Sequence, residues 1–301
     1  MRYSKPAISL QKQVSELKAK GLLFNDESQA EVTLSRISYY RLRAYTYPFQ
    51  DNTSPKHPFV QQISFEEIIE LYKFDRKLRI LVFDAIEKIE IALRTQIIYQ
   101  FAMSYGSHWQ TDPNLYRDTA RFTKHLGTLQ GEIDRSDETF IEHYHNKYST
   151  PSQPPSWMSL EVASMGTLSK IYQNLKKGSE KQAVANSFGL PEINIMENWM
   201  FCFSSLRNIC AHHGRLWNRR MSAIVKLSYN TTGTFLNKQE IKKIYPNKLY
   251  SVLCAVKYML DQIDAANGFS NDLKILIDSC PVGQEKEMGF VKDWDKHPLW
   301  N

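Results

Sequence analysis

The stretch from Phe65 to Phe101 contains neither glycine nor proline, and its apolar residues recur at the spacing of an α-helix. The apolar stripe consists of Ile68, Leu71, Tyr72, Leu78, Leu81, Val82, Ala85, Ile86, Ile89 and Leu93. Charged residues fill much of the remaining surface, and Glu90 and Arg94 stand four residues apart, where they can pair. The pattern predicts one long helix that is apolar along one side.

The rest of the chain also has mostly helical patterning. Further helices are predicted over residues 9–20, 26–37, 119–144, 157–175, 180–188, 192–213, 247–266 and 273–277. Residues 221–229 are predicted to be a strand or an extended segment, and the proline-containing stretches 51–58 and 149–155 to be loops. Core positions are expected at Trp157, Met158, Leu160, Trp294 and Trp300. The sequence therefore predicts an all-α fold with at most a minor extended segment.

Composition limits the class of protein further. Of the 301 residues, 42% are hydrophobic and 23% are charged, which is typical of a folded chain with a sizeable core. The four cysteines form no Cys-x-x-Cys pair, so neither a disulfide framework nor a zinc ribbon is indicated. No apolar leader or window of about 18 apolar residues is present. We therefore expect a cytoplasmic protein without a membrane partner, whose net charge of +6 is compatible with a polyanionic partner.

The densest polar cluster spans residues 206–220 and follows an apolar aromatic run, so a buried helix is predicted to deliver a polar end. Asn208 and His212 are four residues apart and share one helix face, and Arg207 lies toward the neighbouring face. Gly214 is expected to end the helix, which leaves His212 and His213 in its last turn. The negative end of the helix dipole lies there and attracts cations.

These residue types suit RNA cleavage without a metal ion. The 2′-hydroxyl must lose a proton, the 5′-oxygen must gain one, and the charge of the phosphate must be neutralised. Histidine can transfer the protons, arginine can bind the phosphate, and Asn208 can orient the imidazole or contact the phosphate. Since one chain supplies one such histidine, two copies across a two-fold axis would supply an acid and a base.

Two other interpretations of the cluster stay open. It can be a helix end with solvated arginines and histidines, because the pattern itself is short. Zinc binding by Cys210, His212 and His213 is disfavoured, because these spacings point the side chains around the helix and no fourth ligand is near.

The segment from Arg207 to His212 resembles the R-N-x-x-x-H signature of HEPN-domain ribonucleases. Over nearly its whole length the chain resembles the AbiD/AbiF-type abortive-infection proteins of bacteria, the Abi-like group. The residues that carry this resemblance are Ser38–Leu42, Tyr47–Phe49, Phe74–Arg79, Glu87–Ile91, Trp157–Met158, Gly166–Ser169, Tyr172, Cys210–Arg219, Gly289–Phe290 and Trp294.

The resemblance implies a HEPN-type helical bundle with extra N-terminal helices, in one Abi-like domain over residues 1–301. Within it, residues 1–62 would form a helical region rich in tyrosine and arginine, and residues 63–301 the HEPN-like core. It also implies a homodimeric, metal-independent endoribonuclease for phage defence or a toxin–antitoxin system, without a cofactor. A small RNA could then serve as antitoxin. By the same resemblance, Arg207, Asn208 and His212 are catalytic, and His213 is an alternative or supporting histidine.

A second candidate RNA-binding region contains interleaved arginines and tyrosines. The residues proposed to bind RNA are Arg36, Tyr39, Tyr40, Arg41 and Arg43, together with Arg215 and Arg219 of the polar cluster. The competing interpretation, which we favour for residues 36–49, is that the tyrosines pack a helix end while the arginines extend along the surface.

Several carboxylates and histidines are predicted to be structural. Asp75, Glu87 and Glu90 have cationic neighbours, so ion pairing is favoured over metal binding or acid–base chemistry. Glu142, His143 and His145 are predicted to lie at a solvated helix end.

The functions that compete with an endoribonuclease are a non-catalytic RNA-binding or scaffold protein, and a protein that modifies nucleotides.

Overall fold

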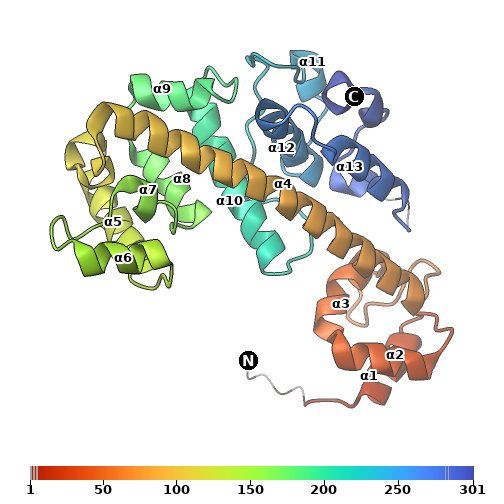
Figure 1. Ribbon diagram of the computed structural model, residues 1–301. Helices are drawn as coiled ribbons and strands as arrows, with labels where there is room; N and C mark the ends of the chain where they lie inside the picture. The colour runs from red at the N-terminus through yellow and green to blue at the C-terminus, as the bar shows by residue number, and fades with distance from the viewer. Residues whose placement is uncertain (1, 3, 5, 282, 284) are drawn as a thin grey trace. The chain divides into compact units, whose positions relative to one another are not determined.

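The computed structural model describes residues 2, 4, 6–281, 283 and 285–301 (Figure 1). Within them there are thirteen α-helices, short 3₁₀ segments and no strand beyond three isolated β-bridges, which confirms the all-α class. The α-helices are α1 Leu10–Ala19, α2 Glu27–Arg36, α3 Tyr39–Thr46, α4 Phe65–Tyr105, α5 Thr119–Ile133, α6 Thr139–Lys147, α7 Ser156–Ser159, α8 Met165–Asn174, α9 Ser179–Asn186, α10 Ile193–Ala211, α11 Lys238–Ile241, α12 Leu249–Ile263 and α13 Phe269–Asp278. Residues 221–229 are irregular.

The chain divides into two compact units, and the boundaries between them fall within α4, within α13 and directly before Glu285. Unit 1 comprises the described residues of Met1–Arg79 and Ile275–Gln284, and unit 2 comprises those of Ile80–Lys274 and Glu285–Asn301.

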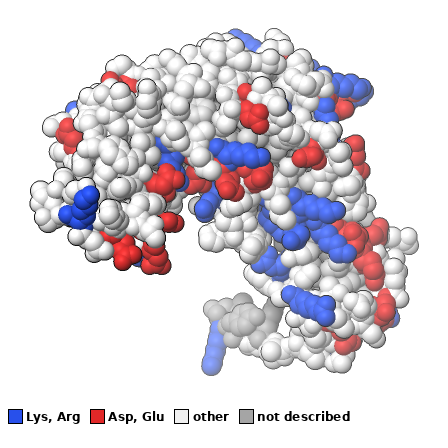
Figure 2. Space-filling view, viewed as in Figure 1, with Lys and Arg blue, Asp and Glu red and all other residues white. Residues whose placement is uncertain are grey.

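The long predicted helix is confirmed as α4, which runs one turn further than the sequence pattern indicated. Before its first residue, the hydroxyl of Ser64 accepts from the Glu67 amide, and the Glu67 carboxylate accepts from the Ser64 amide, a capping box. After its last residue, Gly106 adopts a φ of +83°. Most of the stripe residues are buried, and basic and acidic side chains lie interspersed along α4 on the face drawn in Figure 2.

Unit 1 contains a buried ion pair on the first half of α4. Asp75 is 0% exposed and Arg79 is 5% exposed, and the two side chains pair one helical turn apart. The hydroxyl of Tyr45, from α3, donates to the Asp75 carboxylate, and its oxygen lies 3.3 Å from an Arg79 terminal nitrogen. Burial, followed by the charge of Asp75, raises the pKa of Tyr45, so this hydroxyl stays protonated.

In unit 2, α10 packs against α8, α9 and α12, and α8 also packs against α5. The C-terminal segment closes this core: Trp294 and Trp300 are buried as predicted and pack around Tyr250. Leu160 is also buried, but the prediction for Trp157 is wrong, because this side chain is 49% exposed. Helix α7 is a single turn in which Ser156 and Ser159 are buried instead, and Met158, also predicted to be core, is half-buried.

Two predicted helices are each interrupted. Residues 119–144 form α5 and α6 with a break at 134–138, and residues 157–175 form α7 and α8 with a break at 160–164. In the second break, the carbonyls of Leu160, Glu161 and Ala163 accept from the buried guanidinium of Arg94. A remote side chain therefore stabilises backbone groups that a helix would have paired internally.

No helix in the described part of the chain combines the length and the apolar character needed to cross a membrane.

The buried pair on α4 gives a stability prediction. Arg79→Met removes a cationic partner of the buried Asp75 carboxylate, so we expect the free energy of unfolding to fall by about 3–5 kcal/mol. Arg76→Met, at an exposed position on the same helix, should change it by less than about 0.5 kcal/mol. Urea denaturation followed by circular dichroism measures both. Equal values for the two variants would contradict a structural role of the pair.

Candidate functional site

The polar cluster lies at the C-terminal end of α10, as the sequence predicted. The helix is fixed by buried residues on several sides, among them Trp199, Met200, Phe203 and Leu206, which are all 0% exposed. The indole nitrogen of Trp199 donates to the carbonyl of Lys226 at 2.8 Å. A helix held in this way presents its last turn in a defined orientation.

The helix ends in a Schellman motif, in which His212 is the C-cap. The amide of Gly214 donates to the carbonyl of Ile209 at 2.7 Å, and the amide of His213 donates to the carbonyl of Cys210 at 3.0 Å. His213 adopts the left-handed conformation with a φ of +56°. The motif turns the chain sharply directly after the candidate catalytic residues.

The expectation that Gly214 ends the helix and leaves both histidines in its last turn is wrong, because α10 ends at Ala211, His212 is the C-cap and His213 adopts the positive φ. Gly214 follows the left-handed residue, and a Cβ at its position would lie 3.1 Å from both the Cγ2 atom and the carbonyl oxygen of Ile209. The glycine therefore allows a close approach to the last turn of α10, and His213 adopts the positive φ.

Arg207 points from α10 toward α4. Its guanidinium carbon lies 5.7 Å from the centroid of the Phe83 ring, and its Nε atom lies 3.8 Å from a carboxylate oxygen of Glu90. The side chain remains 35% exposed, and its two terminal nitrogens have no partner among the described residues. These nitrogens are available to a ligand, and a guanidinium matches the oxygens of a phosphate.

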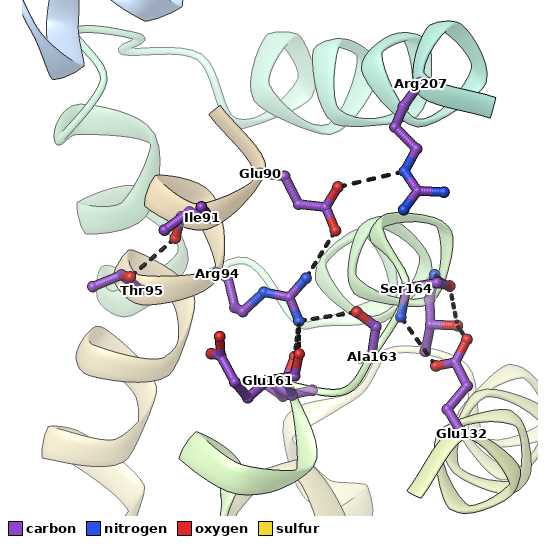
Figure 3. A network of polar contacts seen from close by, with 11 residues as sticks. Glu90, Ile91, Arg94, Thr95, Glu132, Glu161, Ala163, Ser164 and Arg207 are labelled. Carbon is purple, nitrogen blue, oxygen red and sulfur yellow. Dashed lines mark hydrogen bonds and ion pairs between the residues drawn. The ribbon is translucent and has the colours of Figure 1, made fainter. Parts of the chain in front are cut away.

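Glu90 connects Arg207 to a buried network (Figure 3). Its other carboxylate oxygen accepts from Arg94 at 2.8 Å, and Arg94 also donates to carbonyls of the break between α7 and α8, at 2.6 Å for Glu161 and 2.9 Å for Ala163. The side chains of Glu90 and Arg94 are 13% and 9% exposed. The predicted pair of Glu90 and Arg94 is thus confirmed, and it also positions Arg207.

Asn208 and His212 are exposed at the end of α10, and the backbone amide of His212 donates to the Asn208 carbonyl at 3.0 Å. His212 follows Arg207 by five positions, and at about 100° per residue the two side chains lie about 140° apart around the helix axis. His213 is also exposed. One chain thus presents an arginine on the side facing α4 and an amide and an imidazole on the neighbouring side.

Arg215 and Arg219 lie in the loop that follows the site. The guanidinium of Arg215 is 5.9 Å from the ring centroid of the buried Trp217, and a terminal nitrogen of Arg219 donates to the Arg215 carbonyl at 3.2 Å. Both arginines are half-buried, and these contacts stabilise the conformation of the loop.

The other residues proposed to bind RNA lie in unit 1. Arg36, Arg41 and Arg43 are exposed, and Tyr40 is 82% exposed, whereas Tyr39 is half-buried and contacts Lys20. The packing interpretation holds for Tyr45, which is buried. The side chains of Tyr40, Arg36 and Arg43 are accessible to a ligand.

The carboxylates and histidines that the sequence marked as structural are confirmed in part. Asp75 pairs with Arg79 and Glu90 with Arg94, while Glu87 is exposed. Glu142, His143 and His145 are exposed near the end of α6, as predicted.

The sequence analysis did not identify the contacts that hold Arg207. Phe83 lies outside the predicted apolar stripe, and Glu90 was assigned to Arg94 alone. The only local signal was the spacing of Glu90 and Arg94, since Arg207 is more than a hundred residues away in the chain.

A family model described as Abi-like protein matches residues 32–218, more than half of the chain. The chain belongs to the Abi-like protein family. Membership of this family indicates a role in abortive infection, a defence against phage. The matched range contains Phe83, Glu90, Arg94 and the whole end of α10. No curated protein and no solved structure matches the chain.

The shared carboxylate gives a second stability prediction. Glu90→Gln removes the negative charge beside the buried Arg94, so we expect the free energy of unfolding of this Abi-like protein to fall by about 2 kcal/mol. Glu87→Gln, on the exposed side of the same helix, should cost less than about 0.5 kcal/mol. Urea denaturation of both variants measures the difference. Two indistinguishable curves would mean that Glu90 does not stabilise the network.

Proposed function

We propose that this Abi-like protein is a metal-independent endoribonuclease of the HEPN type, with its site at the end of α10. The observation that carries the proposal is the pair of terminal nitrogens on Arg207, which have no partner in the described part of the chain, on the same helix end as the exposed Asn208 and His212. The resemblance of Arg207–His212 to the R-N-x-x-x-H signature supports the same assignment.

In the proposed reaction, Arg207 binds the non-bridging oxygens of the scissile phosphate and stabilises the charge that develops there. A histidine accepts the proton of the 2′-hydroxyl, whose oxygen attacks the adjacent phosphorus. The bond to the 5′-oxygen breaks, and that oxygen receives a proton from a second acid. The products are a 2′,3′-cyclic phosphate and a free 5′-hydroxyl. Asn208 orients the imidazole of His212 or contacts the phosphate.

The proposed active form is a homodimer. Since Arg207 and His212 point to different sides of one helix end, a second copy across a two-fold axis would bring another imidazole to the phosphate. The two copies of His212 would then supply the base and the acid. An RNA would be the substrate, and a small RNA could act as antitoxin in a toxin–antitoxin arrangement.

A non-catalytic RNA-binding protein is the second candidate. The observation that favours it is the separation of Arg207 and His212 within one chain, which by itself gives phosphate binding without proton transfer.

The cleavage prediction uses purified protein, a labelled RNA pool and excess EDTA. Arg207→Ala and His212→Ala should each reduce the cleavage rate at least about 100-fold, because each removes a group that acts only in the transition state. Arg220→Ala, an exposed arginine in the following loop, is the matched control and should cleave at the wild-type rate. His213→Ala tests which histidine acts, and we expect it to retain more activity than His212→Ala.

The products and the folding of the variants decide between the two candidates. Fragments that end in a 2′,3′-cyclic phosphate, lost in both site variants with unchanged circular dichroism, would support the nuclease. Wild-type protein that binds the RNA and leaves it intact as a purified dimer would support the non-catalytic binder instead.

A further inference from the structure

A cavity of about 260 Å³ lies between α5 and α8, apart from the end of α10. Its charged lining is entirely basic: Arg121, Lys124 and His125 come from α5, and Lys170 comes from α8. Gln173 and Asn174, at the end of α8, complete the polar wall. We call this cavity the α5–α8 pocket.

The positive charge of the pocket is largely uncompensated. Lys124 and Lys170 are exposed and form no ion pair with any described residue. Arg121 lies 3.3 Å from Asp118, but its side chain remains 68% exposed. Asp118 also caps α5, because its other carboxylate oxygen accepts from the Arg121 amide at 2.9 Å. One engaged carboxylate therefore stands against three cations.

His125 lies in the positive electrostatic potential of these cations. Its ring lies half-buried in the pocket wall, and its Nδ1 atom is buried without a hydrogen-bond partner among the residues that the structure describes. Burial, followed by the charges of Lys170, Arg121 and Lys124, lowers the pKa of His125. An anion in the pocket would offset these charges.

The pocket lies within reach of the candidate site. The side-chain amide of Gln173 is 3.5 Å from the carbonyl of Glu197, which precedes Arg207 on α10 by ten residues. Ten residues of helix correspond to about 15 Å. A stacked nucleic-acid strand advances about 3.4 Å per nucleotide, so about four nucleotides span this distance.

We propose that the α5–α8 pocket binds a backbone phosphate of single-stranded RNA, about four nucleotides from the phosphate at Arg207. The inference rests on the proposed function for the identity of the ligand as RNA. The pocket itself recognises phosphate by charge, through Lys124, Lys170 and Arg121, with His125 as a further donor. It makes no base contacts, so it contributes affinity and register without sequence preference.

The test compares two full-length double variants of equal net charge. Lys124→Gln/Lys170→Gln removes two pocket cations, and Lys226→Gln/Lys242→Gln removes two exposed lysines that do not line the pocket. The binding of a labelled single-stranded RNA of about twenty nucleotides is measured in EDTA between 50 and 200 mM salt. For the pocket variant, the slope of log affinity against log salt should fall by about 0.7, which corresponds to one lost phosphate contact. The salt-dependent loss of affinity over this range then shrinks roughly 2.6-fold, and the control keeps the wild-type slope.

Two further measurements, one with a shorter RNA and one with inorganic phosphate, distinguish the possible outcomes of this test. With an RNA of three nucleotides, which cannot reach both places, the pocket variant should bind like the wild type. A wild-type salt slope for the pocket variant on the long RNA would overturn the inference and leave the nuclease proposal intact. If the wild type binds no RNA, the proposed function fails, and calorimetry with inorganic phosphate tests the pocket alone. Phosphate binding lost in the pocket variant would then support a site for free phosphate, and no binding would overturn the site.

Discussion

The carboxylate of Glu90 is the group on which the candidate site depends. Arg94 is buried and donates to carbonyls that no helix pairs, so it needs a negative charge close by. Glu90 supplies that charge with one oxygen and holds Arg207 at 3.8 Å with the other. One side chain on α4 thereby fixes both the break before α8 and the guanidinium at the end of α10, so stability and positioning are coupled through a single residue.

The distance between Glu90 and Arg207 determines how strongly this carboxylate holds the guanidinium. A separation of 3.8 Å is longer than a hydrogen bond, and the arginine is one-third exposed, so the ion pair with Glu90 is weak. The nitrogens that face away from Glu90 are the ones that a phosphate would contact. The guanidinium is therefore oriented by Phe83 and Glu90 on one side without being neutralised on the other. An arginine fully paired with Glu90 would be a poorer ligand for an anion.

Sequence analysis predicted the features that depend on local patterns. The long helix α4 follows from a periodic stripe without glycine or proline, and the polar end of α10 follows from a cluster behind an apolar run. The break between α7 and α8 could not be predicted, because Arg94, far away in the chain, stabilises it. The sequence analysis ended α10 at Gly214, whereas the helix ends at Ala211. Gly214 lies close to Ile209, a contact that the local pattern did not indicate. The link from Glu90 to Arg207 is likewise a tertiary contact.

The two ends of α8 differ in charge, and this difference determines in which direction a polyanion bound at Arg207 would run along the surface. At the start of α8, Glu132 binds the amide of Ser164 and the hydroxyl of Thr167, and Glu132, Glu138 and Glu161 line a cavity of about 510 Å³ with one arginine. At the other end of α8 lies the basic pocket. A polyanion bound at Arg207 would be repelled by the carboxylates and attracted by the lysines. The charges of unit 2 therefore favour one course for a bound strand, along α8 toward its C-terminal end.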